Sequence, residues 1–262
     1  MGGLARRRAQ SAVRFGGGLA GPALAPGKRF VLFGTGRVGS ELLMDLLNAH
    51  PDIVCDGEIL TDDTLRHPGH LMEWRAVRAR ARGAKAYGFK LLTSQLRRAT
   101  SISDPHAFLA RLAARGDVIV LMERRNLLSV GVSFIQAETI GWHHRTDSDP
   151  PAGQQIEVDP IDAVHGVYAL EEATAWNESV VEGIAHLRVV YEDDLEDPAR
   201  QQSTVDTIVN ALGLPSAPVS TELVRVVPRA LRDRIANYDE VADVLSRTRY
   251  ARYLDQPDPR VS

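Results

Sequence analysis

Gly34, Gly36, Arg37, Gly39 and Ser40 stand close together in the stretch Phe-Gly-Thr-Gly-Arg-Val-Gly-Ser. Glycines that accept positive φ let a backbone curl until its N–H groups converge on an anion. A guanidinium and a hydroxyl in the same turn add a charged and a neutral donor for phosphate oxygens. These residue types at this spacing predict a phosphate-binding loop.

Two elements must position that loop. The apolar run 30–34 predicts a buried strand, and the apolar spacing over 39–49 predicts a helix that begins where the loop ends. A helix N-terminus offers unpaired N–H groups and the positive end of the helix dipole, both of which favour bound phosphate. The ligand of this strand–loop–helix unit therefore decides much of the function.

One interpretation of the loop is a dinucleotide site. Residues 34–39 match the pattern G-x-G-x-x-G, and Asp56 or Glu58 follows at about the 20-residue distance of a ribose-binding acid. This interpretation predicts an NAD(P)-dependent or flavin oxidoreductase. The loop alone does not exclude it.

Apolar runs and helical periodicity alternate along the rest of the chain. We predict strands at 53–55, 87–92, 118–122 and 187–191, and helices at 71–82, 105–115, 126–139, 160–183 and 198–212. Alternating strands and helices predict an α/β fold in which helices cover both faces of a central, mostly parallel sheet.

Composition limits the classes of protein. The net charge of −3 over 262 residues gives no general nucleic-acid footprint, and no apolar run reaches the roughly 18 residues of a membrane span. A single cysteine, Cys55, excludes an internal disulfide framework and favours a reducing, cytoplasmic location. We expect a flexible basic tail over 1–27, a single domain over 28–262, and within it an Arg-rich extension from about 218, irregular with one helix.

A second group of donors follows the strand at 118–122. Arg125 stands at the strand end and Ser133 eight residues later, about two turns along the next predicted helix. An arginine fork and a hydroxyl so spaced suit a second phosphate. Arg124 is one residue out of register and remains an alternative to Arg125.

Four stretches together resemble one family, in that family's order along the chain. They are the loop Arg37-Val38-Gly39-Ser40, the strand Tyr87-Gly88-Phe89-Lys90-Leu91, the Arg125 and Ser133 pair, and the strand end Tyr191-Glu192-Asp193-Asp194-Leu195. They resemble sulfotransferases that use 3′-phosphoadenosine 5′-phosphosulfate (PAPS), nearest to bacterial carbohydrate types similar to the nodulation-factor and trehalose enzymes. A nicotinamide enzyme has no reason to carry the last three stretches.

The resemblance implies a fold, a donor and a set of donor-binding residues. The fold is a three-layer arrangement similar to P-loop NTPases, the donor is PAPS, the product is PAP (3′-phosphoadenosine 5′-phosphate), and no metal is required. The donor-binding positions are Thr35, Gly36, Arg37, Val38, Gly39, Ser40, Arg125 and Ser133.

The loop departs from the family at two positions. Family members commonly carry Ser or Thr where this chain has Val38 and, after Ser40, Glu41. A carboxylate suits a helix N-terminus but not a nearby phosphate, so Glu41 is expected to point away from the ligand. The departures leave open a non-catalytic relative that only binds PAP or another nucleotide.

For catalysis we expect Arg37 to stabilise charge on the departing phosphate and Glu58 to accept the proton of the acceptor hydroxyl. Glu58 follows the strand 53–55, whose end lies near the phosphate loop if that strand neighbours 30–34. His50, His143 and His144 are alternatives for the base.

The acceptor is expected to be a small hydroxylated molecule, a carbohydrate or a glycolipid. Trp142, His143 and His144 follow the helix 126–139, where the family builds its acceptor pocket, and Lys90 is a further candidate. Trp176 and Asn177 are weaker candidates for the same pocket. A homodimer stays open, since some relatives dimerise.

Overall fold

Five parallel strands form the centre of the fold, in the order β2-β3-β1-β4-β5. The computed structural model describes residues 27–61, 67–99, 101–140, 155–223 and 230–254. The strands are β1 (Lys28–Gly34), β2 (Ile53–Glu58), β3 (Ala86–Leu92), β4 (Val118–Glu123) and β5 (His186–Val190). β1 is central, because it pairs with β3 on one side and β4 on the other.

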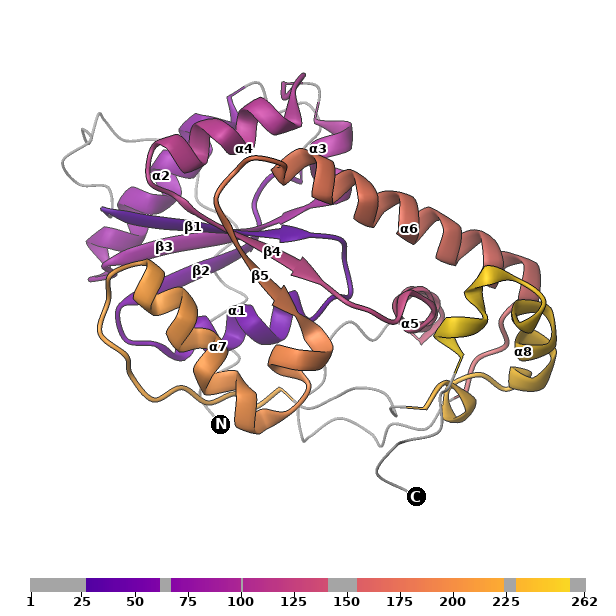
Figure 1. The fold of residues 1–262 in the computed structure, drawn as a ribbon. Helices are drawn as coiled ribbons and strands as arrows, with labels where there is room; N and C mark the ends of the chain where they lie inside the picture. The colour runs from indigo at the N-terminus through magenta and orange to yellow at the C-terminus, as the bar shows by residue number, and fades with distance from the viewer. Residues whose placement is uncertain (1–26, 62–66, 100, 141–154, 224–229, 255–262) are drawn as a thin grey trace.

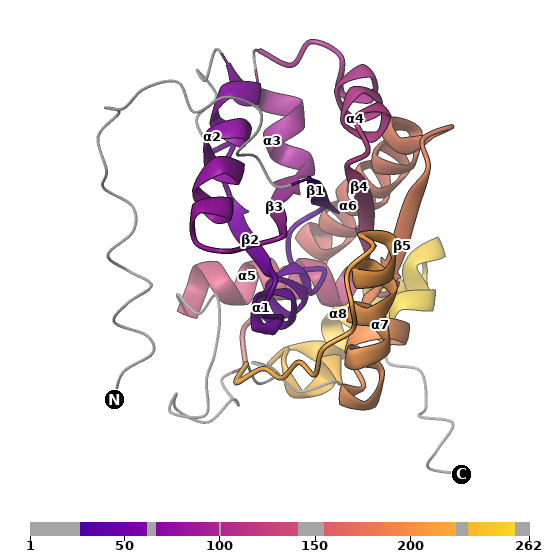
Figure 2. The same ribbon diagram turned by 90° about the vertical axis from the view of Figure 1, so that its left-hand side faces the viewer.

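Helices cover both faces of the sheet (Figures 1 and 2). One face carries α1 (Ser40–Ala49) and α7 (Pro198–Ala211). The other carries α2 (Pro68–Ala81), α3 (Thr93–Arg98), α4 (Pro105–Ala114) and the C-terminal part of α6 (Pro160–Val181). The predicted three-layer α/β fold, with a P-loop-like strand–loop–helix unit at its centre, is confirmed.

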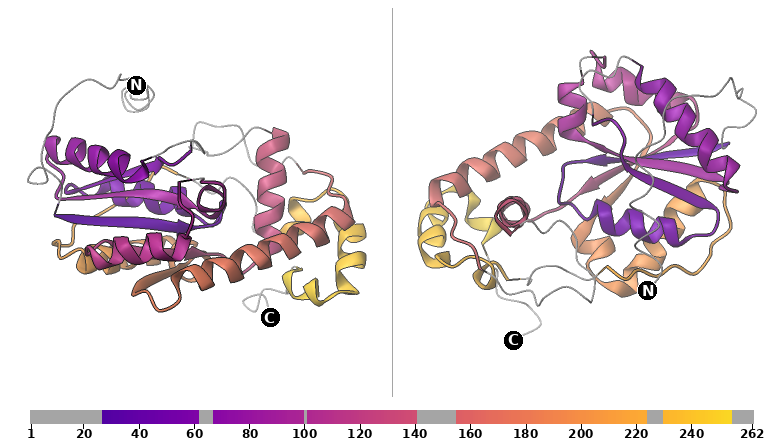
Figure 3. Two further views of the ribbon diagram at one scale, coloured as in Figure 1. Left: turned by 90° about the horizontal axis from the view of Figure 1, so that it is seen from above. Right: turned by 180° about the vertical axis from the view of Figure 1, so that it is seen from behind.

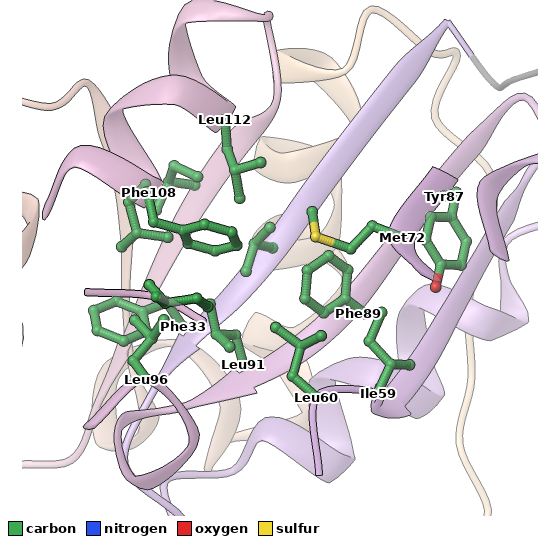
Figure 4. Close-up of a cluster of buried hydrophobic side chains, with 14 of the residues drawn as sticks. Phe33, Ile59, Leu60, Met72, Tyr87, Phe89, Leu91, Leu96, Phe108 and Leu112 are labelled. Carbon is green, nitrogen blue, oxygen red and sulfur yellow. The ribbon is translucent and has the colours of Figure 1, made fainter. Parts of the chain in front are cut away.

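Side chains that alternate between the two faces of the sheet form two hydrophobic cores. Phe30 and Leu32 of β1 pack into the core beneath α1 and α7, whereas Val31 and Phe33 pack into the core of the opposite face. Figure 4 shows Phe33 in the second core, together with aliphatic and aromatic side chains from β3 and the covering helices. Because successive strand residues point to opposite faces, one apolar strand supports both layers and holds its carboxyl end rigidly.

A third core lies beyond the carboxyl ends of the strands (Figure 3). It joins α5 (Leu127–Ile140) and the N-terminal part of α6 to the C-terminal segment 230–254, which contains α8 (Tyr238–Ser246). The helix expected in the C-terminal extension is therefore present. Outside α8 the segment has only the short 3-10 turns Leu231–Asp233 and Arg249–Tyr253, yet its buried side chains Leu231, Ile235, Val241 and Leu245 are part of the core.

The predicted strands and helices are all present, with ends that differ by up to about three residues. Sequence analysis did not predict α3, which begins directly after β3. The condition that β2 neighbour β1 is not met, since β3 lies between them. Within the described residues, no helix is long and apolar enough to cross a membrane. Residues 1–26 of the expected tail lie outside the described residues.

Candidate functional site

The predicted phosphate loop connects β1 to α1 through two left-handed residues. Arg37 has φ 65° and Gly39 has φ 86°. At Gly39 a Cβ would stand 2.5 Å from the Tyr191 ring, and at Gly36 it would stand 2.9 Å from the Phe134 ring. At Gly39 both the positive φ and the close approach favour glycine, whereas at Gly36 a side chain would displace the partly exposed Phe134 ring. Left-handed residues in such turns direct backbone N–H groups toward a shared anion site.

Arg37 lies against the helix that carries the second predicted phosphate donor. Its Nε donates to Oγ of Ser133 at 3.0 Å, although the two residues come from opposite ends of the expected site. Burial and, next, the nearby Arg124 lower the pKa of Arg37 from its ordinary value. The two neighbouring positive charges of Arg37 and Arg124 create a local potential that favours binding of an anion.

The two neighbouring arginines take different places. Arg124 has a buried side chain, donating from Nη1 to the carbonyl oxygen of Arg37 at 3.3 Å and from Nη2 to Oγ of Ser129 at 3.0 Å. Arg125 has a 63% exposed side chain and pairs with Asp193. Arg124 therefore stabilises the loop through the carbonyl oxygen of Arg37, whereas the Arg125 guanidinium lies at the surface.

The Tyr191-Glu192-Asp193-Asp194-Leu195 stretch forms one turn of π-helix at the end of β5. The Tyr191 ring lies against Gly39. The Arg124 guanidinium stacks over this ring, with its Cζ 4.6 Å from the ring centroid. The Glu192 carboxylate accepts the backbone N–H groups of Arg125 and Asn126 at 3.0 and 3.3 Å. π-helical turns often occur at functional sites, and this one joins the phosphate loop to the start of α5.

Lys90 connects the loop side of the site to β2. Its buried ammonium forms an ion pair with Glu41 at the start of α1 and lies 3.6 Å from Oε1 of Glu58. Burial, followed by repulsion from Arg37, lowers the pKa of Lys90 to about 8. The Glu41 carboxylate acts in the opposite direction, because an opposite charge favours the protonated amine.

Glu58 reaches this position through an irregularity in β2. The pairing of β2 with β3 shifts at Gly57, so that Asp56 pairs with Phe89 and Glu58 with Lys90. Burial raises the pKa of Glu58, and Nε2 of Gln95 approaches its Oε2 at 3.5 Å. Glu58 therefore meets Lys90 even though β3 separates its strand from the phosphate loop.

Two comparisons with known proteins place this site in context. Over 251 aligned residues the chain is 27% identical to nodulation protein H of Rhizobium meliloti, covering 88% of this chain and 96% of that protein, and it matches the strain 1021 protein to the same extent. The chain is therefore a distant homologue of nodulation protein H. A sulfotransferase structure from Alicyclobacillus acidocaldarius is 14% identical with a TM-score of 0.44, covering 87% of this chain and 96% of that one. No protein-family model matches the sequence.

The strand order tests the dinucleotide interpretation of the glycine loop. In a dinucleotide fold the strand carrying the ribose-binding acid lies next to the strand that leads into the glycine loop. Here β2 is two places away from β1, and Asp56 accepts a hydrogen bond from the Tyr87 hydroxyl at 3.0 Å. The geometry thus disfavours the NAD(P) interpretation of the loop.

The remaining predicted candidates fall into two groups. Trp142, His143 and His144 lie outside the described residues. His50 is buried and bonded to backbone groups, 3.0 Å from the Pro215 oxygen and 3.2 Å from the Asp52 nitrogen, which is a structural role. Over the described residues, no group of three or more His, Cys, Asp or Glu side chains could hold a metal ion.

Sequence analysis missed two contributors to the site, Phe134 and Gln95, and named a third, Tyr191, only as part of a family motif. Tyr191 and Phe134 contact the loop glycines, and Gln95 lies beside Glu58 from the unpredicted α3. Phe134 follows Ser133 directly and is 38% exposed, an unusual position for a large apolar side chain next to a phosphate loop. The residue Trp176, in contrast, packs on Phe33 of the core with ring centroids 6.5 Å apart.

The lowered pKa of Lys90 gives a pH-dependent expectation for anionic ligands. As pH rises through about 8, the Lys90 ammonium loses its proton, so its contribution to binding PAP is expected to fade between pH 7 and 9.5. In Lys90→Arg the charge is permanent, and this decline should be absent. Calorimetric titration of PAP against both proteins at several pH values tests the difference. An identical decline in both would assign the titration to another group.

Proposed function

We propose that the protein transfers a sulfuryl group from PAPS to a hydroxyl of a small acceptor, a carbohydrate or glycolipid. The observation that carries the proposal is the hydrogen bond from Arg37 to Ser133. This bond brings the phosphate loop next to α5, which carries the second phosphate donor, Ser133. A ligand with phosphate groups at both ends needs two such sites close together. The motif resemblance to PAPS-dependent sulfotransferases and the distant homology to nodulation protein H support the same donor.

The residues present fit such a donor. Thr35, Gly36, Val38 and Gly39 would offer backbone N–H groups to the 5′-phosphosulfate, with Arg37 and Ser40 adding side-chain donors. Ser133 and Arg125 would hold the 3′-phosphate. Arg125 would have to exchange Asp193 for phosphate, and the cost is small because exposed ion pairs contribute only about 0–1 kcal/mol.

The chemistry breaks one sulfur–oxygen bond to the donor phosphate and forms another to the acceptor oxygen. Glu58 takes the proton that the acceptor hydroxyl loses, a role suited to a carboxylate whose pKa burial has raised. Arg37 and Ser40 stabilise the negative charge left on the phosphate. Lys90 lies between Glu41 and Glu58, and its ion pair with Glu41 neutralises the carboxylate that would otherwise repel a phosphate in the loop.

An exposed aromatic side chain favours an acceptor with an apolar ring face. Phe134 lies against Gly36 of the loop and keeps 38% of its surface exposed. Aromatic rings pack against the C–H face of sugars while the sugar hydroxyls stay hydrated. A cytoplasmic location and a homodimer belong to the same proposal and rest on sequence composition and family resemblance.

Ligand-dependent thermal denaturation separates the candidate functions. A ligand at 100 times its dissociation constant adds about 2.7 kcal/mol, a shift of a few degrees for a chain of this length. PAP is expected to raise the melting temperature, and NADP and ATP are not. Labelled PAPS with a panel of glycans then tests transfer. Stabilisation by NADP alone would overturn the proposal, and stabilisation by PAP without any transfer would favour a non-catalytic PAP-binding protein.

The two arginines at the end of β4 should respond differently to replacement. Arg125→Ala is expected to weaken PAP about 10-fold with an unchanged melting temperature, because it removes one exposed charged donor. Arg124→Ala is expected to weaken PAP and also lower the melting temperature, because it removes contacts with Arg37, Ser129 and Tyr191. Calorimetry and thermal denaturation measure both. Unchanged PAP affinity in Arg125→Ala would remove Arg125 from the donor site.

A further inference from the structure

Arg234 is a fully buried arginine in the C-terminal segment. Its guanidinium donates to Oγ of Ser129 at 2.6 Å, to the Ser129 carbonyl oxygen at 3.2 Å, and to Oε1 of Gln136 at 3.1 and 3.0 Å. Burying a guanidinium is costly unless its donors are satisfied. Ser129 and Gln136 are also buried, so the guanidinium and its partners satisfy one another away from water.

Ser129 connects this arginine to the phosphate loop. Its hydroxyl oxygen also accepts from Arg124, whose other nitrogen donates to the carbonyl oxygen of Arg37. A hydroxyl has two lone pairs and can accept from both guanidinium groups at once. The position of each guanidinium therefore depends on the other through one shared oxygen.

The face of α5 held by Arg234 is the face that carries the donor-binding serine. Ser129, Ser133 and Gln136 recur at helical spacing and lie on one side of α5. Ser129 and Gln136 bond to Arg234, and Ser133, between them, bonds to Arg37. The C-terminal segment thus fixes this side of α5 relative to the loop.

We propose that Arg234 is a positioning residue for the donor site. By holding Ser129 and Gln136, it keeps Arg124 against the Arg37 carbonyl and keeps Ser133 in reach of the loop. The loop conformation, with Arg37 left-handed, then depends on the C-terminal segment as well as on β1 and α1. The choice of PAP as the probe rests on the proposed function, whereas the coupling of loop and C-terminal segment does not.

Arg234→Lys tests the proposal, since it keeps the charge and loses the planar fork of donors. Ser129→Ala removes the shared hydroxyl. Arg232→Met is the matched control, because Arg232 lies on the same turn, is exposed, and pairs with Asp239 at 2.9 Å. PAP affinity is measured by calorimetry, and hydrogen exchange is measured for the amides of residues 35–43, both well below the melting temperature.

We expect Arg234→Lys and Ser129→Ala to weaken PAP about tenfold and to speed exchange in the loop, with no change in the acceptor KM. Arg232→Met should change neither quantity. A merely structural role would lower the melting temperature of Arg234→Lys while PAP affinity and loop exchange at low temperature stay as in the wild type, and that result overturns the proposal. If the wild type does not bind PAP, the proposed function fails. Loop exchange then decides the role of Arg234 alone.

Discussion

Glu58→Gln is expected to lower turnover by about 10²- to 10⁴-fold while PAP affinity stays within about twofold of the wild type. Glutamine keeps the size of the side chain and its contact with Lys90 but cannot accept a proton. PAP affinity should be spared because Glu58 reaches the loop only through Lys90 and Glu41. Initial rates with labelled PAPS, combined with calorimetry of PAP, measure the two quantities.

The pH profile supplies a second readout for Glu58. Burial raises its pKa above the ordinary 4.5, so the base is lost by protonation as pH falls through that raised value, and kcat should fall with it. The acid limb should disappear in Glu58→Gln. Asp56→Asn is the control on the same strand, because Asp56 bonds to Tyr87 and Arg75 instead. Full turnover in Glu58→Gln would show that another group accepts the proton.

Replacing Arg37 is expected to have the largest effect on donor binding. Arg37→Ala should weaken PAP about 10- to 100-fold, the usual cost of removing charge-assisted hydrogen bonds. Arg37→Gly should weaken PAP equally, since it also removes the charge. The two variants should differ in stability, because glycine accepts φ 65° without strain and alanine does not.

Comparing the two Arg37 variants separates backbone strain from charge. We expect Arg37→Gly to melt above Arg37→Ala by an amount that corresponds to about 1 kcal/mol. Thermal denaturation without ligand measures the strain, and calorimetry of PAP measures the charge. Wild-type affinity in either variant would place the phosphate-binding cation elsewhere, with Lys90 as the next candidate.

The layered fold could be predicted because its signals are local. The apolar runs at β1 and β4 and the glycine turn before α1 depend on neighbouring residues only, and the structure has these elements where the sequence predicts them. The strand order could not be predicted. Which strand pairs with β1 depends on how the chain crosses between strands, as in the pairing of Lys28 with Ala86, and not on the residues next to each strand. For that reason sequence analysis could state the neighbourhood of β2 and β1 only as a condition, which the structure does not meet.

Within the site, sequence analysis found the hydrogen-bond donors of the glycine turn. It was less complete for side chains that come from distant parts of the chain. Arg234 gave no signal, since an arginine in an Arg-rich segment is ordinarily exposed. Tyr191 had been assigned to a family motif, but its packing on Gly39 is a contact between β5 and the loop after β1. Such contacts depend on strand order and so appear only with the structure.

The position of β3 between β2 and β1 has a consequence for how the chain folds during synthesis. β1 cannot pair with the next strand that is made, and its partners arrive only when Ala86 and then Val118 have emerged. Contacts this distant in sequence close slowly. β1 and β2 therefore stay unpaired on the nascent chain until β3 is made. The phosphate loop between β1 and α1 takes its final form only after α5 and the turn that follows β5, which both contact it, have been added.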